Sequence, residues 1–222
     1  MIGYIREIKA ATLAMLIVVG LCVHARHAEA AEPETLVVAG GCFWCVESDF
    51  ERVSGVIEAE SGFTGGTVEN PTYKQVTRGG TGHYEAVRIT FDPATVSRET
   101  LLALFLRSVD PTDAEGQFCD RGDSYRTAIF VSDAEEEQLA EVVISAAAAD
   151  LGQDIVTPIL SLESFYLADA GHQDYYKSSD IVLTRFGPRT KATAYKLYRE
   201  ACGRDARVRA LWGVDAPFAG HF

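Results

Sequence analysis

Apolar residues recur along the first half of the chain with two periods, and each period predicts a type of secondary structure. A short apolar run at 36–39 predicts a strand that ends at Gly40-Gly41. From Cys42 to Val53 the apolar residues recur at helical spacing, so a helix is expected to follow the two glycines. Residues 84–91 alternate between apolar and polar side chains, which predicts a further strand.

The remaining predicted elements complete an α+β pattern. Residues 64–83 are rich in Gly, Thr and Asn and predict a long loop. Ser132 and Glu135 form a capping-box pattern that opens a helix running to Gly152. Further strands are predicted at 56–63, 125–131, 157–160 and 162–166, and further helices at 97–109 and 190–201. The order β-α-β-β-α-β predicts a ferredoxin-like (split β-α-β) two-layer sandwich.

The first thirty residues have the features of a signal peptide. Arg6 and Lys9 form a basic segment, residues 10–23 are apolar, and 28–30 read Ala-Glu-Ala, an A-x-A cleavage pattern. The apolar run is shorter than the roughly 20 residues that a transmembrane helix needs. We therefore expect export with cleavage before Ala31, and a retained membrane anchor is the alternative.

Removal of this segment leaves a chain that suits a single domain. We expect one domain at 31–222, with a core at about 36–177 and an irregular C-terminal extension at 178–222. The mature chain has 17 basic and 30 acidic residues, a net charge of −13. Such a negative field repels nucleic acid and anionic membrane surfaces, so neither is an expected partner.

Two of the four cysteines in the mature chain lie one helical turn apart. Cys42 begins the predicted helix, where unpaired N–H groups and the helix dipole lower the pKa of a thiol from roughly 8.5. The thiolate is the nucleophilic form, so Cys42 is the predicted reactive residue. Cys45 lies within reach of it for a disulfide. Half of a zinc site and a permanent structural disulfide are the alternative interpretations of this C-x-x-C.

Glu85 is the candidate proton donor. On its predicted strand it shares a face with Val87, Ile89 and Phe91. Burial on an apolar face raises the pKa of a carboxyl group, which makes it able to give up a proton near neutral pH. A partly exposed carboxylate at the beginning of the strand is the alternative.

The segment from Gly40 to Trp44, Gly-Gly-Cys-Phe-Trp, is followed by Glu47 and resembles the active-site signature of A-type peptide methionine sulfoxide reductases. Three further blocks resemble the same family in order and spacing. They lie at 61–66 with 70–73 and 81–85, at 110–112 with 120–122 and 125–126, and at 165–166 with 172–173. The likeness extends over roughly residues 36–177, whereas a C-x-x-C alone is a weak signal.

This resemblance implies a reaction and the residues that perform it. Cys42 attacks the sulfur of methionine sulfoxide while Glu85 gives a proton to the departing oxygen. Tyr73 and Tyr125 hydrogen-bond that oxygen, helped by Asp120 and bound water. The family acts on the S epimer, free or in peptides, and the attacking cysteine becomes a sulfenic acid.

The resemblance also implies an apolar pocket for the substrate's methyl group, formed by Phe43 and Trp44. Three cysteines are candidates to resolve the sulfenic acid. Cys45 is nearest along the helix and is the expected residue, and Cys119 beside the Asp120 position is its rival. Cys202, near the end of the C-terminal helix, is expected either to take a second exchange or to be a buried thiol.

Together these inferences predict a peptide-methionine (S)-S-oxide reductase that repairs oxidised exported proteins, in the bacterial periplasm. The resulting disulfide needs an external dithiol such as a thioredoxin-like protein, since the compartment is oxidising. No metal or organic cofactor is predicted, because the histidines are scattered and no phosphate-binding glycine motif is present. A monomer is expected. A general thiol–disulfide oxidoreductase and a secreted binding domain held by two disulfides are the alternatives.

Overall fold

The structure is a computed structural model that describes residues 31–213 and 216–220. The predicted signal peptide at 1–30 therefore lies outside the described residues. Residues Glu32–Phe222 belong to one unit by their contacts. Among the helices that the structure describes, none is long and apolar enough to cross a membrane.

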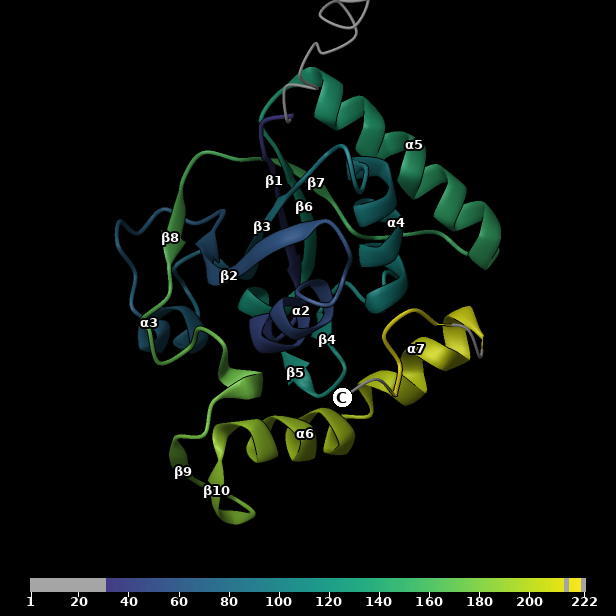
Figure 1. Cartoon of the computed structure of the whole chain (residues 1–222). Coiled ribbons are helices and arrows are strands. Elements are labelled where there is room, and N and C mark those ends of the chain that lie inside the picture. Colours follow the sequence, from purple (N-terminus) through teal and green to yellow (C-terminus); the bar gives the residue numbers. More distant parts are fainter. Residues whose placement is uncertain (1–30, 214–215, 221–222) are drawn as a thin grey trace, which may run out of the picture. The chain divides into compact units, whose positions relative to one another are not determined.

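A six-stranded mixed sheet organises the fold (Figure 1), with the strand order β7-β6-β1-β3-β2-β8. Its strands are β1 (Glu34–Gly40), β2 (Val56–Thr64), β3 (Tyr84–Phe91), β6 (Thr127–Val131), β7 (Ile159–Ser161) and β8 (Phe165–Leu167). Strands β6 and β7 pair in parallel, and the other neighbours pair antiparallel. β1 and β2 thus lie on either side of β3, and both run opposite to it.

The chain is therefore a mixed α/β fold with, in the described residues, six α-helices. The four inner strands account for the predicted strand order, and β7 and β8 extend the sheet at both edges. Because the sheet is larger than the predicted one and contains a parallel pair, the ferredoxin-like description stays a prediction.

Three helices pack on one face of the sheet, namely α2 (Phe43–Phe50), α4 (Arg98–Ser108) and α5 (Ala134–Leu151). Alternate strand residues such as Val38 and Ile89 form the core with Phe50 and Leu101. Figure 1 shows α4 and α5 side by side over this face. A smaller cluster around Phe130 covers the other face.

The predicted loop at 64–83 contains a helix, α3 (Tyr73–Arg78), so that prediction is wrong for these residues. Thr72 Oγ1 accepts a hydrogen bond from the Gln75 N–H, and the Gln75 side chain accepts one from the Thr72 N–H. This capping box satisfies backbone donors that the first turn of a helix leaves unpaired. The cap therefore makes a polar segment helical and fixes the position of Tyr73.

The C-terminal extension is also more regular than predicted. It contains a hairpin of β9 (Ile181–Thr184) and β10 (Gly187–Thr190), then α6 (Lys191–Ala201) and α7 (Arg204–Trp212). Helix α6 buries Ala194 and Tyr195 in a cluster with Cys45 of α2. Burial of these side chains orders the segment, and in Figure 1 α6 lies beneath α2. Short elements β4 (Gly116–Gln117), β5 (Asp120–Arg121) and the 3₁₀ helices η1 (Asp123–Tyr125) and η2 (Tyr175–Lys177) complete the fold.

Candidate active site

Cys42 lies at the N-cap of α2, directly after a turn that only glycine allows. Gly41 has a φ of +80°, and a Cβ there would lie 2.6 Å from the Gln117 Cβ. A Cβ at Gly40 would lie 2.9 Å from a methyl carbon of Val109. The Gly-Gly pair therefore lets β1 turn into α2 under close packing and leaves the Cys42 side chain half-buried.

A cavity of about 490 Å³ collects most of the residues predicted from the sequence. Those that line it are Cys42, Trp44, Tyr73, Glu85, Cys119, Asp120, Tyr125 and Cys202. Tyr175 and residues of the C-terminal extension, namely Val182, Leu183, Thr184, Arg185, Tyr195 and Tyr198, line the remainder. No sequence pattern indicates this second group, because the place where the extension packs depends on contacts between distant segments.

Glu85 is buried beneath this cavity, with 1% of its surface exposed. One carboxyl oxygen, Oε2, accepts a hydrogen bond of 3.1 Å from the backbone N–H of Phe43, while Oε1 has no protein partner among the described residues. Burial raises the pKa of Glu85 to about 8, although the Phe43 N–H opposes this shift. The predicted burial is confirmed, and near neutral pH the carboxyl group is largely protonated.

Two phenols and a second carboxyl group surround the same space. Burial is the main cause that raises the pKa of Tyr73 and of Tyr125, and the charge of Glu85 is the next. Both phenols are therefore neutral hydrogen-bond donors. Burial also raises the pKa of Asp120, against the attraction of Arg204. The cavity thus presents donors and a protonated acid to a group that gains negative charge.

The family model described as peptide methionine sulfoxide reductase matches residues 34–201. The chain belongs to this family. A reductase named MsrA 2 from Caulobacter vibrioides is 48% identical over 185 residues, which is 83% of this chain and 88% of the relative. A reductase of the same name from Rhizobium meliloti is 45% identical and covers 87% of this chain and 90% of its own length.

Solved structures of the family are also similar. Methionine sulfoxide reductase A of Corynebacterium diphtheriae aligns with a TM-score of 0.59 at 31% identity, over 65% of this chain and 74% of that chain. Reduced Mxr1 from Saccharomyces cerevisiae aligns with a TM-score of 0.61 at 28% identity, over 65% and 84% of the two chains. The chain is therefore an enzyme of the class peptide-methionine (S)-S-oxide reductase, an oxidoreductase that reduces methionine sulfoxide with thiols.

Of the two residues predicted to bind the substrate's methyl group, Phe43 does not line the cavity. Its ring is 1% exposed and packs in the core, with ring centroids 5.8 Å from Phe63 and 5.5 Å from His172. The first residue of α2 points inward, so Phe43 supports the cavity wall from behind. Trp44 does line the cavity, and its ring stacks on Tyr175 at 3.7 Å.

The pKa of Cys42 is raised in the structure, whereas its position at the start of a helix predicted a lowered pKa. The hydrogen bond with Cys45 and then burial raise the Cys42 pKa, and the charges of Glu85 and Asp120 add to this. The same hydrogen bond lowers the Cys45 pKa to about 7. Burial opposes that shift, and two arginines of the C-terminal extension assist it. The hydrogen bond therefore shifts the two thiol pKa values in opposite directions, and the neighbouring arginines favour the charged form of Cys45.

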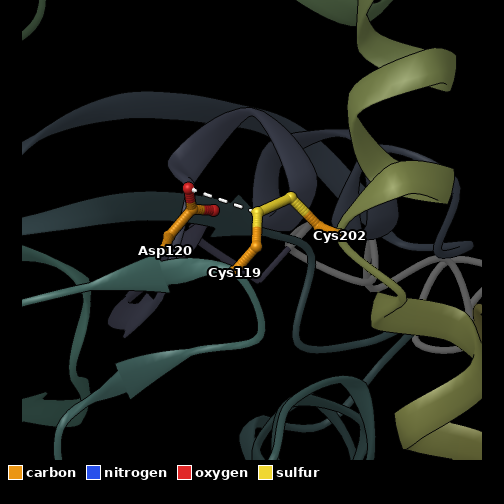
Figure 2. Close-up of a disulfide and its surroundings, with 3 residues drawn as sticks. All are labelled: Cys119, Asp120 and Cys202. Atoms are coloured by element: carbon orange, nitrogen blue, oxygen red, sulfur yellow. Dashed lines mark hydrogen bonds between the residues drawn. A yellow bond between two sulfur atoms is a disulfide. The ribbon is translucent and has the colours of Figure 1, made fainter.

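Cys119 and Cys202 form a disulfide that joins the β4–β5 region to the end of α6 (Figure 2). Cys202 is therefore not the buried thiol of the sequence-based alternative. Figure 2 also shows Asp120 beside this disulfide, with a carboxyl oxygen 3.8 Å from the Cys119 sulfur. Cys42 and Cys45 carry the free thiols among the described residues.

Proposed function

We propose that this reductase acts on the S epimer of methionine sulfoxide, free or in proteins, through a sulfenic acid on Cys42. The observation that carries the proposal is buried Glu85 in the same cavity as the Cys42 thiol, with an Oε1 that has no hydrogen-bond partner among the described residues. A thiol and a neutral acid are what reduction of a sulfoxide needs, because the oxygen is a poor leaving group without a proton.

In the first step the Cys42 sulfur attacks the sulfoxide sulfur, and Glu85 protonates the oxygen. The bond between the two sulfurs then breaks as the oxygen transfers from the substrate sulfur to Cys42 as the hydroxyl of a sulfenic acid. The electron pair of the broken bond stays on the substrate sulfur, and methionine leaves reduced by two electrons. The proton released by the thiol restores neutral Glu85. Tyr73 and Tyr125 donate hydrogen bonds to the oxygen as its negative charge develops, and Trp44 contacts the substrate's methyl group.

In the second step Cys45 attacks the Cys42 sulfenic acid, which forms a disulfide and releases water. The pairing of Cys119 with Cys202 supports this assignment, since it leaves Cys45 as the free thiol next to Cys42. A thioredoxin-like dithiol then reduces the new disulfide and restores the enzyme. These steps require no metal or organic cofactor.

The same proposal places the enzyme in the bacterial periplasm, where it repairs oxidised exported proteins. The signal-peptide pattern at 1–30 supports export. The Cys119–Cys202 disulfide also supports it, because disulfides persist in oxidising compartments.

The test is turnover of separated S and R epimers of a blocked methionine sulfoxide by residues 31–222, with dithiothreitol as reductant. We expect reduction of the S epimer alone, and no reduction by Cys42→Ser. Cys119→Ser is the matched control, since it removes a cavity cysteine without touching the nucleophile. Turnover of neither epimer, with reduction of simple disulfides intact, would instead identify a general thiol–disulfide oxidoreductase.

A further inference from the structure

A cluster of buried charges lies between α2 and the C-terminal extension. Asp49 is 1% exposed, Arg199 is 4% exposed and Arg204 is 1% exposed. Arg199 Nη1 donates to Asp49 Oδ1 at 2.8 Å, and Arg199 Nε donates to Asp205 Oδ1 at 2.9 Å. The two arginines come from α6 and the start of α7, so the C-terminal extension brings both cations to the helix that carries the thiol pair.

Arg204 is poorly matched by the protein groups around it. Its Nη1 donates to the Gly40 carbonyl at 3.2 Å, and its Nε lies 3.9 Å from Asp49 Oδ2. Within the described residues, Nε and Nη2 have no hydrogen-bond acceptor, and the guanidinium lies 4.8 Å above the Phe118 ring. A buried cation with unpaired donors is costly unless an anion compensates it.

Cys45 is the remaining ionisable group on this side of α2. Its side chain is buried one turn before Asp49 and packs against Tyr195. The Tyr195 hydroxyl in turn accepts a hydrogen bond of 2.9 Å from Arg199 Nη1, so Tyr195 connects Cys45 to the cationic cluster. The titratable or charged groups that act on Cys45 are Cys42, Asp49, Glu85, Tyr195, Arg199 and Arg204. Two of these six are cations, and both belong to the C-terminal extension.

We propose that Arg204, assisted by Arg199, is a positioning residue that holds Cys45 as a thiolate, ready to attack oxidised Cys42. This role rests on the proposed function for the identity of the resolving cysteine. In the step that Arg204 assists, an electron pair of the Cys45 thiolate forms the S–S bond. The S–O bond of the sulfenic acid breaks, and hydroxide leaves and becomes water by taking up a proton from solvent.

The electrostatics of the Cys45 thiol agree with this assignment. The Cys45 pKa is lowered to about 7, first by the hydrogen bond with Cys42 and then by Arg204 and Arg199, against the effect of burial. Arg204 also lies beyond residues 34–201, the part of the chain that the family model matches. The counter-charge thus comes from a segment outside the matched region.

The test is a pH titration of thiolate ultraviolet absorbance in the Cys42→Ser background, in full-length mature enzyme with the Cys119–Cys202 disulfide intact. Cys45 is then the free thiol that titrates. We expect Arg204→Gln to raise the midpoint by about one unit, because removal of a nearby positive charge disfavours the thiolate. Arg204→Lys should restore most of the shift. Arg209→Gln, an exposed arginine on the same helix, is the matched control and should change nothing.

A kinetic readout accompanies the titration. In single turnovers of the Cys42-containing enzyme, Arg204→Gln should slow disulfide formation about threefold per unit of pKa shift, since a more basic thiolate is scarcer but more nucleophilic. Release of the first methionine should be unchanged.

An Arg204→Gln midpoint equal to that of Arg209→Gln would overturn the proposal. If Arg204→Gln does not fold, Arg204→Met, which keeps the apolar volume of the side chain, is titrated in its place, and a midpoint equal to that of Arg209→Gln again contradicts the proposal. The titration uses no sulfoxide, so its outcome is independent of whether the S epimer is reduced.

Discussion

Cys42 and Cys45 are one helical turn apart, yet the groups around the two sulfurs differ in kind. Cys42 faces the protonated carboxyl of Glu85 and the neutral phenol of Tyr73, whereas Cys45 faces the guanidinium groups of the C-terminal extension, Arg204 among them. Burial is the main cause that raises the pKa values of the acid and the phenol. The groups around Cys42 are therefore protonated near neutral pH, whereas the arginines around Cys45 stabilise a negative charge.

This difference matches the two halves of the proposed reaction. Attack on the sulfoxide requires a proton for the departing oxygen, and attack on the sulfenic acid requires a thiolate. The two environments also come from different parts of the chain. The acidic side, around Cys42, is built by α2, α3, β3, β5 and η1. The cationic side, around Cys45, is built by α6 and α7.

Loss of the proton carried by Glu85 should have the largest effect on activity. We expect Glu85→Gln to lower kcat/KM for the sulfoxide by about 10²–10⁴-fold, the usual contribution of a positioned general acid. Wild-type activity should fall as the pH rises through about 8, since Glu85 then ionises, and this fall should be absent in the variant. Glu60→Gln, which loses an ion pair with Arg88 far from the cavity, is the control. An unchanged pH profile in Glu85→Gln would remove Glu85 from the mechanism.

The same substitution has an expected signature in stability. The Glu85 pKa of about 8 in the folded protein lies above its ordinary value of 4.5, so the native state binds more protons between these pH values. The contribution of Glu85 is therefore fully present below about 4.5 and is lost as the pH rises through about 8. Urea unfolding of wild type and Glu85→Gln at several pH values checks this, and the variant should gain relative stability with rising pH.

Disruption of the cationic side should mainly affect stability. Asp49→Asn removes one of the two carboxylates that pair with buried Arg199, and removal of one partner of a buried ion pair costs about 3–5 kcal/mol. Asp150→Asn, the exposed partner of Arg107, should cost less than about 1 kcal/mol. Equal losses for the two variants in urea unfolding would mean that the buried cluster does not hold the extension in place.

Removal of the Cys119–Cys202 disulfide should cause a smaller loss of folding stability. Cys119→Ser and Cys202→Ser remove the same bond across a separation of 83 residues, so each should destabilise the fold by about 2–4 kcal/mol. The double variant should add little to either single one. Additive losses would show that the two side chains contribute separately rather than through their bond.

Local patterns predicted two residues of the acidic side, Cys42 and Glu85, and the family resemblance implied Tyr73, Tyr125 and Asp120. The Gly-Gly turn placed Cys42 at the start of a helix, and strand alternation placed Glu85 on the buried face. The composition of residues 64–83 predicted a loop, and this was wrong for α3, where the Thr72–Gln75 capping box stabilises a helix within a polar segment.

The cationic side was not predictable, because it depends on contacts between distant segments. Helix α6 was expected, but neither the pairing of Cys119 with Cys202 nor the burial of Arg204 follows from a local pattern. An arginine in a charged C-terminal segment gives no signal of burial by itself. Only the packing of α6 and α7 against α2 assigns it a role.

The most direct test of the division between the two sides is mass mapping of disulfides after one equivalent of methionine sulfoxide, without external reductant. The account predicts a new Cys42–Cys45 bond with the Cys119–Cys202 bond retained. Cys45→Ser should then accumulate the Cys42 sulfenic acid, which a dimedone-type reagent traps. A Cys42–Cys119 or Cys42–Cys202 bond in the wild-type enzyme would contradict the account, since the thiol held by the cationic side would not be the one that resolves the intermediate.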